Sequence, residues 1–188
     1  MQALRSLLET RHFDSVTTVE IASAAGVNEA LIYRYFGDKR GLLHKILAEY
    51  FKIHLSQIRR DVASQLEAIQ NLRVIINGTV SFHKINRVFC YILLLEVRNN
   101  PAYFRSEAYD LARQYSRLIN DIILQGIKEN QIRRDIPLIC MRDVIIGSIE
   151  RACMRQAIFD RDFDEQELAA NLAEVVIRGL SASSAKET

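Results

Sequence analysis

The sequence contains few residues that interrupt helices, with only two prolines and seven glycines among 188 residues. Proline removes a backbone donor and glycine adds backbone freedom, so their scarcity favours long unbroken helices. Alternation of apolar and polar residues, the pattern of a half-buried strand, is nowhere sustained. Apolar residues instead recur at spacings of three and four, as at Leu118, Ile119, Ile122, Ile123 and Ile127. These patterns predict an all-α fold.

Cysteine and long apolar runs are also scarce. The three cysteines, Cys90, Cys140 and Cys153, are far apart, and none stands at metal-ligand spacing with another cysteine or with a histidine. We therefore expect reduced thiols, no metal and no cofactor. No apolar run reaches the 18 residues that a membrane span needs, and Met1–Thr10 is typical of a helix, not of a signal peptide. The chain is expected to be cytoplasmic, with no membrane partner.

Catalytic patterns and a strong charge of either sign are missing as well. The sequence has no glycine-rich phosphate loop and no nucleophile–base pair at a recognisable spacing, which argues against an enzyme. The formal net charge is +2, and residues 1–52 hold seven Lys or Arg against six Asp or Glu, a difference of +1. If this segment binds DNA, its few basic groups must be well placed, since bulk charge is small.

Two short helices are predicted near the N-terminus. Thr17 and Glu20 fit a capping box that opens the first helix, and Gly26 suits its left-handed end. Asn28 then caps a second helix that runs to Phe36. Two such helices joined by Ala-Gly-Val have the form of a helix-turn-helix. The same pattern also fits an ordinary helical hairpin within a bundle.

Further helix boundaries follow from similar signals. The predicted helices run from an Asp38 cap to about Asp61, from Ala102 to Glu129 after the stop at Asn99-Asn100-Pro101, onward from Pro137, and from the Asp164 box to about Leu180.

The stretch FDSVTTVEIASAAGVNEALIYRYFGDKRGLL, residues 13–43, resembles the signature of the tetracycline-repressor (TetR) family of transcription regulators. The matching residues are Thr18, Ile21-Ala22, Ala25-Gly26-Val27, Tyr33, Tyr35-Phe36, Lys39 and Leu42. The resemblance implies a three-helix helix-turn-helix DNA-binding domain over residues 1–46 and a larger helical ligand-binding and dimerisation domain over residues 47–188. It implies about nine helices in total.

In this resemblance the second short helix enters the major groove of an operator. Its early residues Glu29, Ala30 and Leu31, which follow Asn28, are the candidate base readers. A Glu carboxylate accepts from cytosine N4, and Ala or Leu contacts a thymine methyl group. Alternatively, Glu29 only stabilises the positive N-terminus of its helix. Both interpretations stay open.

Phosphate contacts are assigned to Tyr33, Lys39 and Thr18, with Arg34 as a further candidate. The pair Tyr35-Phe36 is expected in the core, wedged against the next helix.

The sequence departs from the family pattern at two places. His12 stands where the family often has glycine, and family members normally carry further, often basic residues ahead of the position of Leu4. We therefore expect a short first helix and weakened phosphate attraction. This leaves an alternative function open, a helical dimer that binds a ligand or a protein but no DNA.

For the C-terminal region the resemblance implies a homodimer whose small effector releases the operator, which is the action of a repressor. Aromatic and aliphatic residues predict a hydrophobic effector, and the stretch from Leu94 to Ile136 loosely resembles family members that sense fatty acyl-CoA or similar lipids. The candidate ligand contacts are Phe82, His83, Phe89, Arg98, Tyr109 and Arg113, although the aromatic residues of this region fit an ordinary core as well. The candidate dimer contacts are Val144, Ile145, Ile149, Leu168, Leu172, Val175 and Val176, although their spacing fits a core within one protomer equally well.

Overall fold

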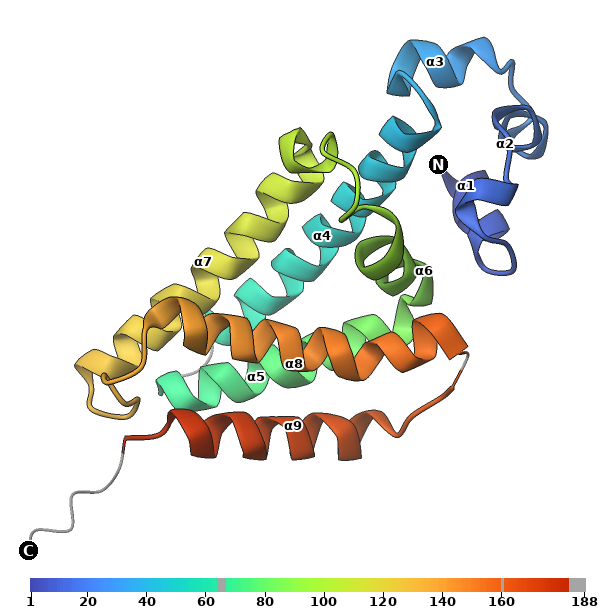
Figure 1. Cartoon of the computed structure of the whole chain (residues 1–188). Coiled ribbons are helices and arrows are strands. Elements are labelled where there is room, and N and C mark those ends of the chain that lie inside the picture. Colours follow the sequence, from blue (N-terminus) through green and yellow to red (C-terminus); the bar gives the residue numbers. More distant parts are fainter. Residues whose placement is uncertain (64–66, 160, 183–188) are drawn as a thin grey trace, which may run out of the picture. The chain divides into compact units, whose positions relative to one another are not determined.

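The computed structural model of the chain describes residues 1–63, 67–159 and 161–182. Across these residues the chain forms nine α-helices and three short helical turns (Figure 1). The one extended pairing in this part of the chain is an isolated bridge between Ile132 and Ser181. The all-α prediction is confirmed.

The helices divide between two compact units. The first unit holds Met1–Ile53 and Asn86–Ala112, and the second holds His54–Ile85 and the chain from Arg113 onward. The predicted DNA-binding domain, residues 1–46, lies within the first unit, which also contains a segment from the middle of the chain. The domain boundary at residue 46 stays a prediction.

The first unit is built from short elements around apolar side chains. Leu4, Phe13 and Leu43 are at most 1% exposed. Its elements are α1 (Gln2–Leu8), the 3-10 turn η1 (Phe13–Ser15), α2 (Thr18–Ala25), α3 (Ala30–Phe36), the start of α4 (Lys39–Ala63), α6 (Arg87–Tyr91), the π-helical turn η2 (Ile92–Glu96), the 3-10 turn η3 (Tyr103–Arg105) and the start of α7 (Glu107–Lys128).

The capping box of α2 forms as predicted. Thr17 Oγ1 accepts from the Glu20 N–H at 3.2 Å, and the Glu20 carboxylate accepts from the Thr17 N–H at 2.7 Å. Arg11 donates to Glu20 at 2.9 Å, and this bond, followed by those from Thr17, lowers the pKa of Glu20 to about 2. Gly26 ends the helix at φ 65°, the left-handed region where glycine has no steric penalty. Local side-chain bonds thus fix both ends of α2.

Other helix ends differ from the prediction. The structure starts α3 at Ala30, although Asn28 Oδ1 accepts from the Ala30 N–H at 2.8 Å as a cap would. Helix α7 starts at Glu107, not at Ala102. The Ser106 hydroxyl accepts from the Tyr109 N–H at 3.3 Å, and Ser106 itself is extended, with ψ 157°. This cap begins the helix five residues later than predicted.

The second unit consists of longer helices that lie side by side. Figure 1 shows α5 (Ala68–Ile85), α8 (Leu138–Phe159) and α9 (Glu165–Leu180) running along one another, and these three pack together. Asp164 caps α9 as predicted, accepting from the Glu167 N–H at 2.9 Å. Gly78 allows a close approach to α4, because a Cβ there would lie 2.8 Å from Cδ1 of Ile58.

A small polar cluster lies among the buried apolar side chains of this unit. Thr79 Oγ1 is 2.7 Å from the Tyr115 hydroxyl and 3.3 Å from Nε2 of His54. The His54 ring stacks on Phe82 with centroids 4.5 Å apart and is 2% exposed. Burial lowers the pKa of His54 to about 4. His54 is therefore neutral in the folded protein at neutral pH.

This burial predicts a pH-dependent stability. The unfolded chain protonates His54 near its ordinary pKa of 6.5, but the folded chain only near 4. The free energy of unfolding should therefore fall as the pH drops from 6.5 towards 4, by about 2 kcal/mol between pH 7 and pH 5. Urea unfolding of the wild type and of His54→Gln at both pH values measures this. The variant should lose that part of the pH dependence, and equal slopes in both proteins would contradict it.

Candidate DNA-binding surface and arginine groove

The surface of the α2–α3 hairpin carries the predicted DNA contacts. Ile21, Ala22 and Ile32 are buried at 2%, 4% and 4% exposure and hold the two helices in place. The early residues of α3 face outward: Ala30 is exposed, as are Leu31 and Tyr33 at 37% and 51%. A surface of this kind can present side chains to a DNA groove.

Glu29 lies close to two of the predicted phosphate contacts. The Thr18 hydroxyl donates to Oε1 of Glu29, and the Tyr33 hydroxyl donates to the same oxygen at 3.5 Å. The two hydroxyl oxygens are 3.3 Å apart. The Glu29 carboxylate thus accepts from the two hydroxyls that a phosphate oxygen would otherwise accept from.

Lys39 lies in a different environment from the one expected of a phosphate contact. Its ammonium donates to the carbonyl oxygens of Phe13 at 2.9 Å and Val16 at 2.7 Å, and it lies 4.2 Å from the centroid of the Phe13 ring. An ammonium has three N–H donors, so at most one remains for DNA. Lys39 therefore holds the turn that leads into α2, whatever its role at a phosphate.

Apart from Arg34, the basic side chains of residues 1–52 have partners within the first unit. Over residues 1–52, all described by the structure, Arg34 is the one basic side chain paired with neither a carboxylate nor a carbonyl; it lies 5.7 Å from the Tyr35 ring. The other pairs are Arg5–Glu49, Arg11–Glu20, Arg40–Asp14, Lys45–Glu107 and Lys52–Glu107. Tyr35, predicted in the core, is 66% exposed, so that prediction was wrong.

The middle segment of the chain contacts the turn before α2. The Tyr91 hydroxyl accepts from the Phe13 N–H at 3.2 Å and donates to the Glu96 carboxylate. Burial first, and then the bond to Glu96, raises the pKa of Tyr91 to about 12. Arg40 donates to the Glu96 carbonyl at 3.4 Å. The sequence gives no signal for this role of Tyr91, because a contact between residues 78 positions apart leaves no local pattern.

The six predicted ligand contacts divide between the two units. Phe89, Arg98 and Tyr109 belong to the first unit, and Phe82, His83 and Arg113 to the second. Phe89 is 1% exposed and meets Phe51 edge-on at 5.2 Å, as a core residue does. Phe82 is also buried, with 5% of its surface exposed. Their role at a ligand stays a prediction.

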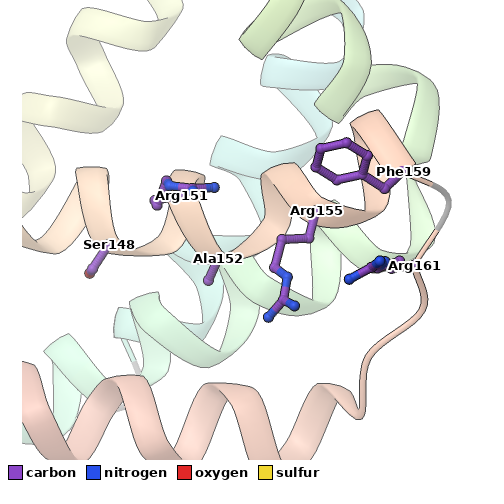
Figure 2. Close-up of a pocket in the computed structure, with 6 residues that line it drawn as sticks. All are labelled: Ser148, Arg151, Ala152, Arg155, Phe159 and Arg161. Carbon is purple, nitrogen blue, oxygen red and sulfur yellow. The ribbon is translucent and has the colours of Figure 1, made fainter.

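A groove that the sequence prediction missed opens on the surface of the second unit. It has a volume of about 720 Å³ and is lined by Ser148, Arg151, Ala152, Arg155, Phe159 and Arg161 (Figure 2). Residues 151, 155 and 159 are spaced by four, which places them on one face of a helix. That spacing was a signal in the sequence, and it identifies the outer face of α8.

The predicted dimer contacts separate into two groups. Ile145, Ile149 and Val176 are at most 4% exposed and belong to the core of the second unit, so they offer no surface to a second copy. The prediction was wrong for these three. Val144 and Val175 are 50% and 73% exposed, and Leu168 and Leu172 are half-buried. The helical period alone could not separate the two faces.

Two family models together match nearly the whole chain. "Bacterial regulatory proteins, tetR family" matches residues 1–46, and "YsiA-like protein, C-terminal region" matches residues 47–179. A curated relative, the "Fatty acid metabolism regulator protein" of Bacillus subtilis (strain 168), is 22% identical over 161 residues, which cover 86% of this chain and 83% of that protein.

Solved structures of similar regulators have the same fold. The regulator FadR from Bacillus subtilis, in complex with stearoyl-CoA, matches with a TM-score of 0.85 at 20% identity, over 95% of this chain and 96% of that one. The fatty acid degradation regulator FadR from Bacillus halodurans matches with a TM-score of 0.84 at 18% identity, over 97% and 94%. No helix in the described part of this chain is long and apolar enough to cross a membrane.

The signature over residues 13–43, the hairpin that presents α3 and the two family models agree. The chain belongs to the TetR family of bacterial regulatory proteins, and it is a ligand-responsive, DNA-binding transcription regulator and not an enzyme.

Proposed function

We propose that this regulator is a cytoplasmic repressor that binds a palindromic operator as a homodimer. The observation that carries the proposal is the α2–α3 hairpin, which is held by buried Ile21 and Ile32 and exposes Ala30, Leu31 and Tyr33. One hairpin reads one half-site. Two hairpins related by a two-fold axis read half-sites about 34–36 Å apart. Exposed Val144 and Val175, on α8 and α9, are the side chains that support a dimer.

We infer further that the effector is a fatty acyl-CoA. The support comes from relatives, since one similar regulator acts in fatty acid metabolism and another is bound to stearoyl-CoA. Release of the operator requires that the effector prefer a conformation with the wrong spacing of the two hairpins. The effector must therefore bind the DNA-free dimer more tightly than the DNA-bound one.

The proposal is tested with a DNA selection followed by titration of the effector. The full chain should select a palindromic site from random duplexes, and stearoyl-CoA should release it from that site in a gel shift. Tyr33→Phe should weaken operator binding, because it removes one hydroxyl from the exposed face of α3. Failure to select any site at low salt, with a dimer present, would instead favour a helical ligand- or protein-binding dimer without DNA binding.

Lys39 and Arg34 should respond differently to substitution. Lys39→Met removes two charge-assisted bonds to the carbonyls of Phe13 and Val16 and should lower the free energy of unfolding by about 2 kcal/mol. Arg34→Gln removes an exposed charge with no such bonds, so it should leave stability unchanged while weakening operator binding. Urea unfolding and fluorescence anisotropy measure the two effects. Unchanged stability of Lys39→Met would refute the structural role.

Glu29 should restrain DNA binding, because it holds the hydroxyls of Thr18 and Tyr33. Glu29→Gln removes its charge at constant size and should strengthen binding to operator and to random DNA by roughly five-fold, which is about 1 kcal/mol. The preference for operator over random DNA should stay unchanged, because the competing carboxylate weakens binding to every sequence alike. Anisotropy titrations at several salt concentrations measure both affinities.

Two comparisons separate this competition from simple charge repulsion. Glu9→Gln removes an exposed acid of the same unit and should change affinity by less than Glu29→Gln. In a Thr18→Val, Tyr33→Phe background the gain from Glu29→Gln should largely disappear, since no hydroxyls remain to be released. A full gain in that background would show that repulsion alone explains the effect.

A further inference from the structure

The polar cluster of the second unit joins three helices through buried side chains. The Tyr115 hydroxyl, on α7, lies 2.7 Å from Oγ1 of Thr79, on α5. The same Oγ1 lies 3.3 Å from Nε2 of His54, on α4. All three side chains are at most 7% exposed, so these polar groups must find their hydrogen-bond partners inside the unit.

One donor of the polar cluster is left without an acceptor in the described part of the chain. Tyr115, Thr79 and a neutral His54 carry one polar hydrogen each, and the two contacts between them use only two of these hydrogens. Nδ1 of His54 is buried and has no partner among the described residues. The imidazole is neutral, because burial lowers the pKa of His54 to about 4.

The direction of the two hydrogen bonds follows from the number of groups that each arrangement leaves unpaired. If Tyr115 donates to Thr79 and Thr79 donates to Nε2 of His54, only the hydrogen on Nδ1 is unpaired. If Nε2 carries the hydrogen instead, a hydroxyl donor and the bare Nδ1 are both left buried and unpaired. Each such group costs free energy, so the first arrangement is favoured. Thr79 and Tyr115 thus hold His54 in the tautomer with its hydrogen on Nδ1.

The surroundings of the imidazole suit an uncharged acceptor. The His54 ring centroid lies 4.5 Å from that of Phe82 and 5.3 Å from that of Tyr115. Burial first, and then the negative charge of Glu150, raises the pKa of Tyr115. A second carboxylate beside a neutral imidazole would therefore be a buried charge without a counter-charge. A carbonyl oxygen accepts a hydrogen bond and brings no charge.

We propose that Nδ1–H of His54 donates to a carbonyl oxygen of the effector, so that the polar cluster recognises one neutral acceptor within a largely apolar ligand. The inference rests on the proposed function, in which the effector is an acyl-CoA. The carbonyl is either that of the thioester or a keto group farther along the acyl chain. A buried donor selects strongly for such a ligand, because a ligand without the acceptor leaves the donor unpaired.

Titration calorimetry on the full chain, without DNA, tests the proposal with three kinds of CoA derivative below their micelle-forming concentrations. These are stearoyl-CoA, the thioether octadecyl-CoA, which lacks the carbonyl, and stearoyl-CoA derivatives with one keto group at different chain positions. If the thioester carbonyl is the acceptor, octadecyl-CoA should bind about ten-fold more weakly than stearoyl-CoA. If a keto group is the acceptor, one keto derivative should bind about ten-fold more tightly than stearoyl-CoA, and octadecyl-CoA should equal stearoyl-CoA.

Two substitutions of His54 separate the loss of the donor from a disturbance of the core. The amide nitrogen of Asn can take the place of Nδ1, whereas the amide of Gln reaches the place of Nε2. His54→Asn should therefore keep most of the preference for the carbonyl, and His54→Gln should lose it. Thr79→Val should also reduce the preference, because Nε2 loses its donor and the hydrogen is no longer held on Nδ1. Thermal melting without ligand shows whether each variant is folded.

Nitrogen NMR of the wild-type imidazole tests the same bond without any substitution. The spectrum should show the hydrogen on Nδ1, and the Nδ1 signal should shift when the preferred CoA derivative binds. Thr79→Val should show a mixture of the two tautomers.

Three results would overturn the inference. They are equal affinity of the wild type for all the CoA derivatives, equal loss of the preference in folded His54→Asn and His54→Gln, and an Nδ1 signal that binding leaves unchanged. Each of them leaves an acyl-CoA effector in place. Absence of binding by every CoA derivative would overturn the proposed effector together with this inference, while selection of an operator in the gel shift decides the DNA-binding function separately.

Discussion

The first unit depends on how the backbone of Phe13 is held. Its carbonyl accepts from Lys39, its N–H donates to Tyr91, and its ring is 1% exposed with the Lys39 ammonium over one face. These contacts bring the start of α4 and the segment after α5 to the turn that precedes α2. Because the capping residue Thr17 follows this turn directly, the position of the α2–α3 hairpin depends on them. An alternative packing would leave the Lys39 ammonium without these two carbonyl partners, which costs free energy. The bonds therefore favour this one position of the turn.

Features set by near neighbours in the chain could be predicted from the sequence. Thr17, Glu20 and Gly26 fix the ends of α2 through bonds and a backbone conformation that involve only a few residues. The start of α7 shows where such reasoning fails. Ala102 follows a strong stop and has good helix propensity, but the hydroxyl of Ser106 caps a later start. Two acceptable caps in one stretch cannot be ranked without the packing around them.

Features set by distant contacts could not be predicted. The helical period placed Val144 and Ile145 in one apolar group, yet one is 50% exposed and the other fully buried. Lys39 has the position of a phosphate contact in the family signature, but its partners are the carbonyls of Phe13 and Val16, in the segment before α2. The groove on α8 is an intermediate case, because residues 151, 155 and 159 lie at helical spacing while the groove itself appears only in three dimensions.

The pairing of charges within residues 1–52, called the DNA-binding head from here on, bears on how DNA is bound. Nearly every basic side chain of residues 1–52 already has an acidic or carbonyl partner, and Glu29 occupies the hydroxyls of Thr18 and Tyr33. A single head therefore gains little from phosphate contacts, which normally supply most non-specific affinity. Two heads joined in a dimer gain the second contact at high effective concentration. Weak individual heads make binding depend on the spacing between them, and a change of spacing is then enough to release the operator.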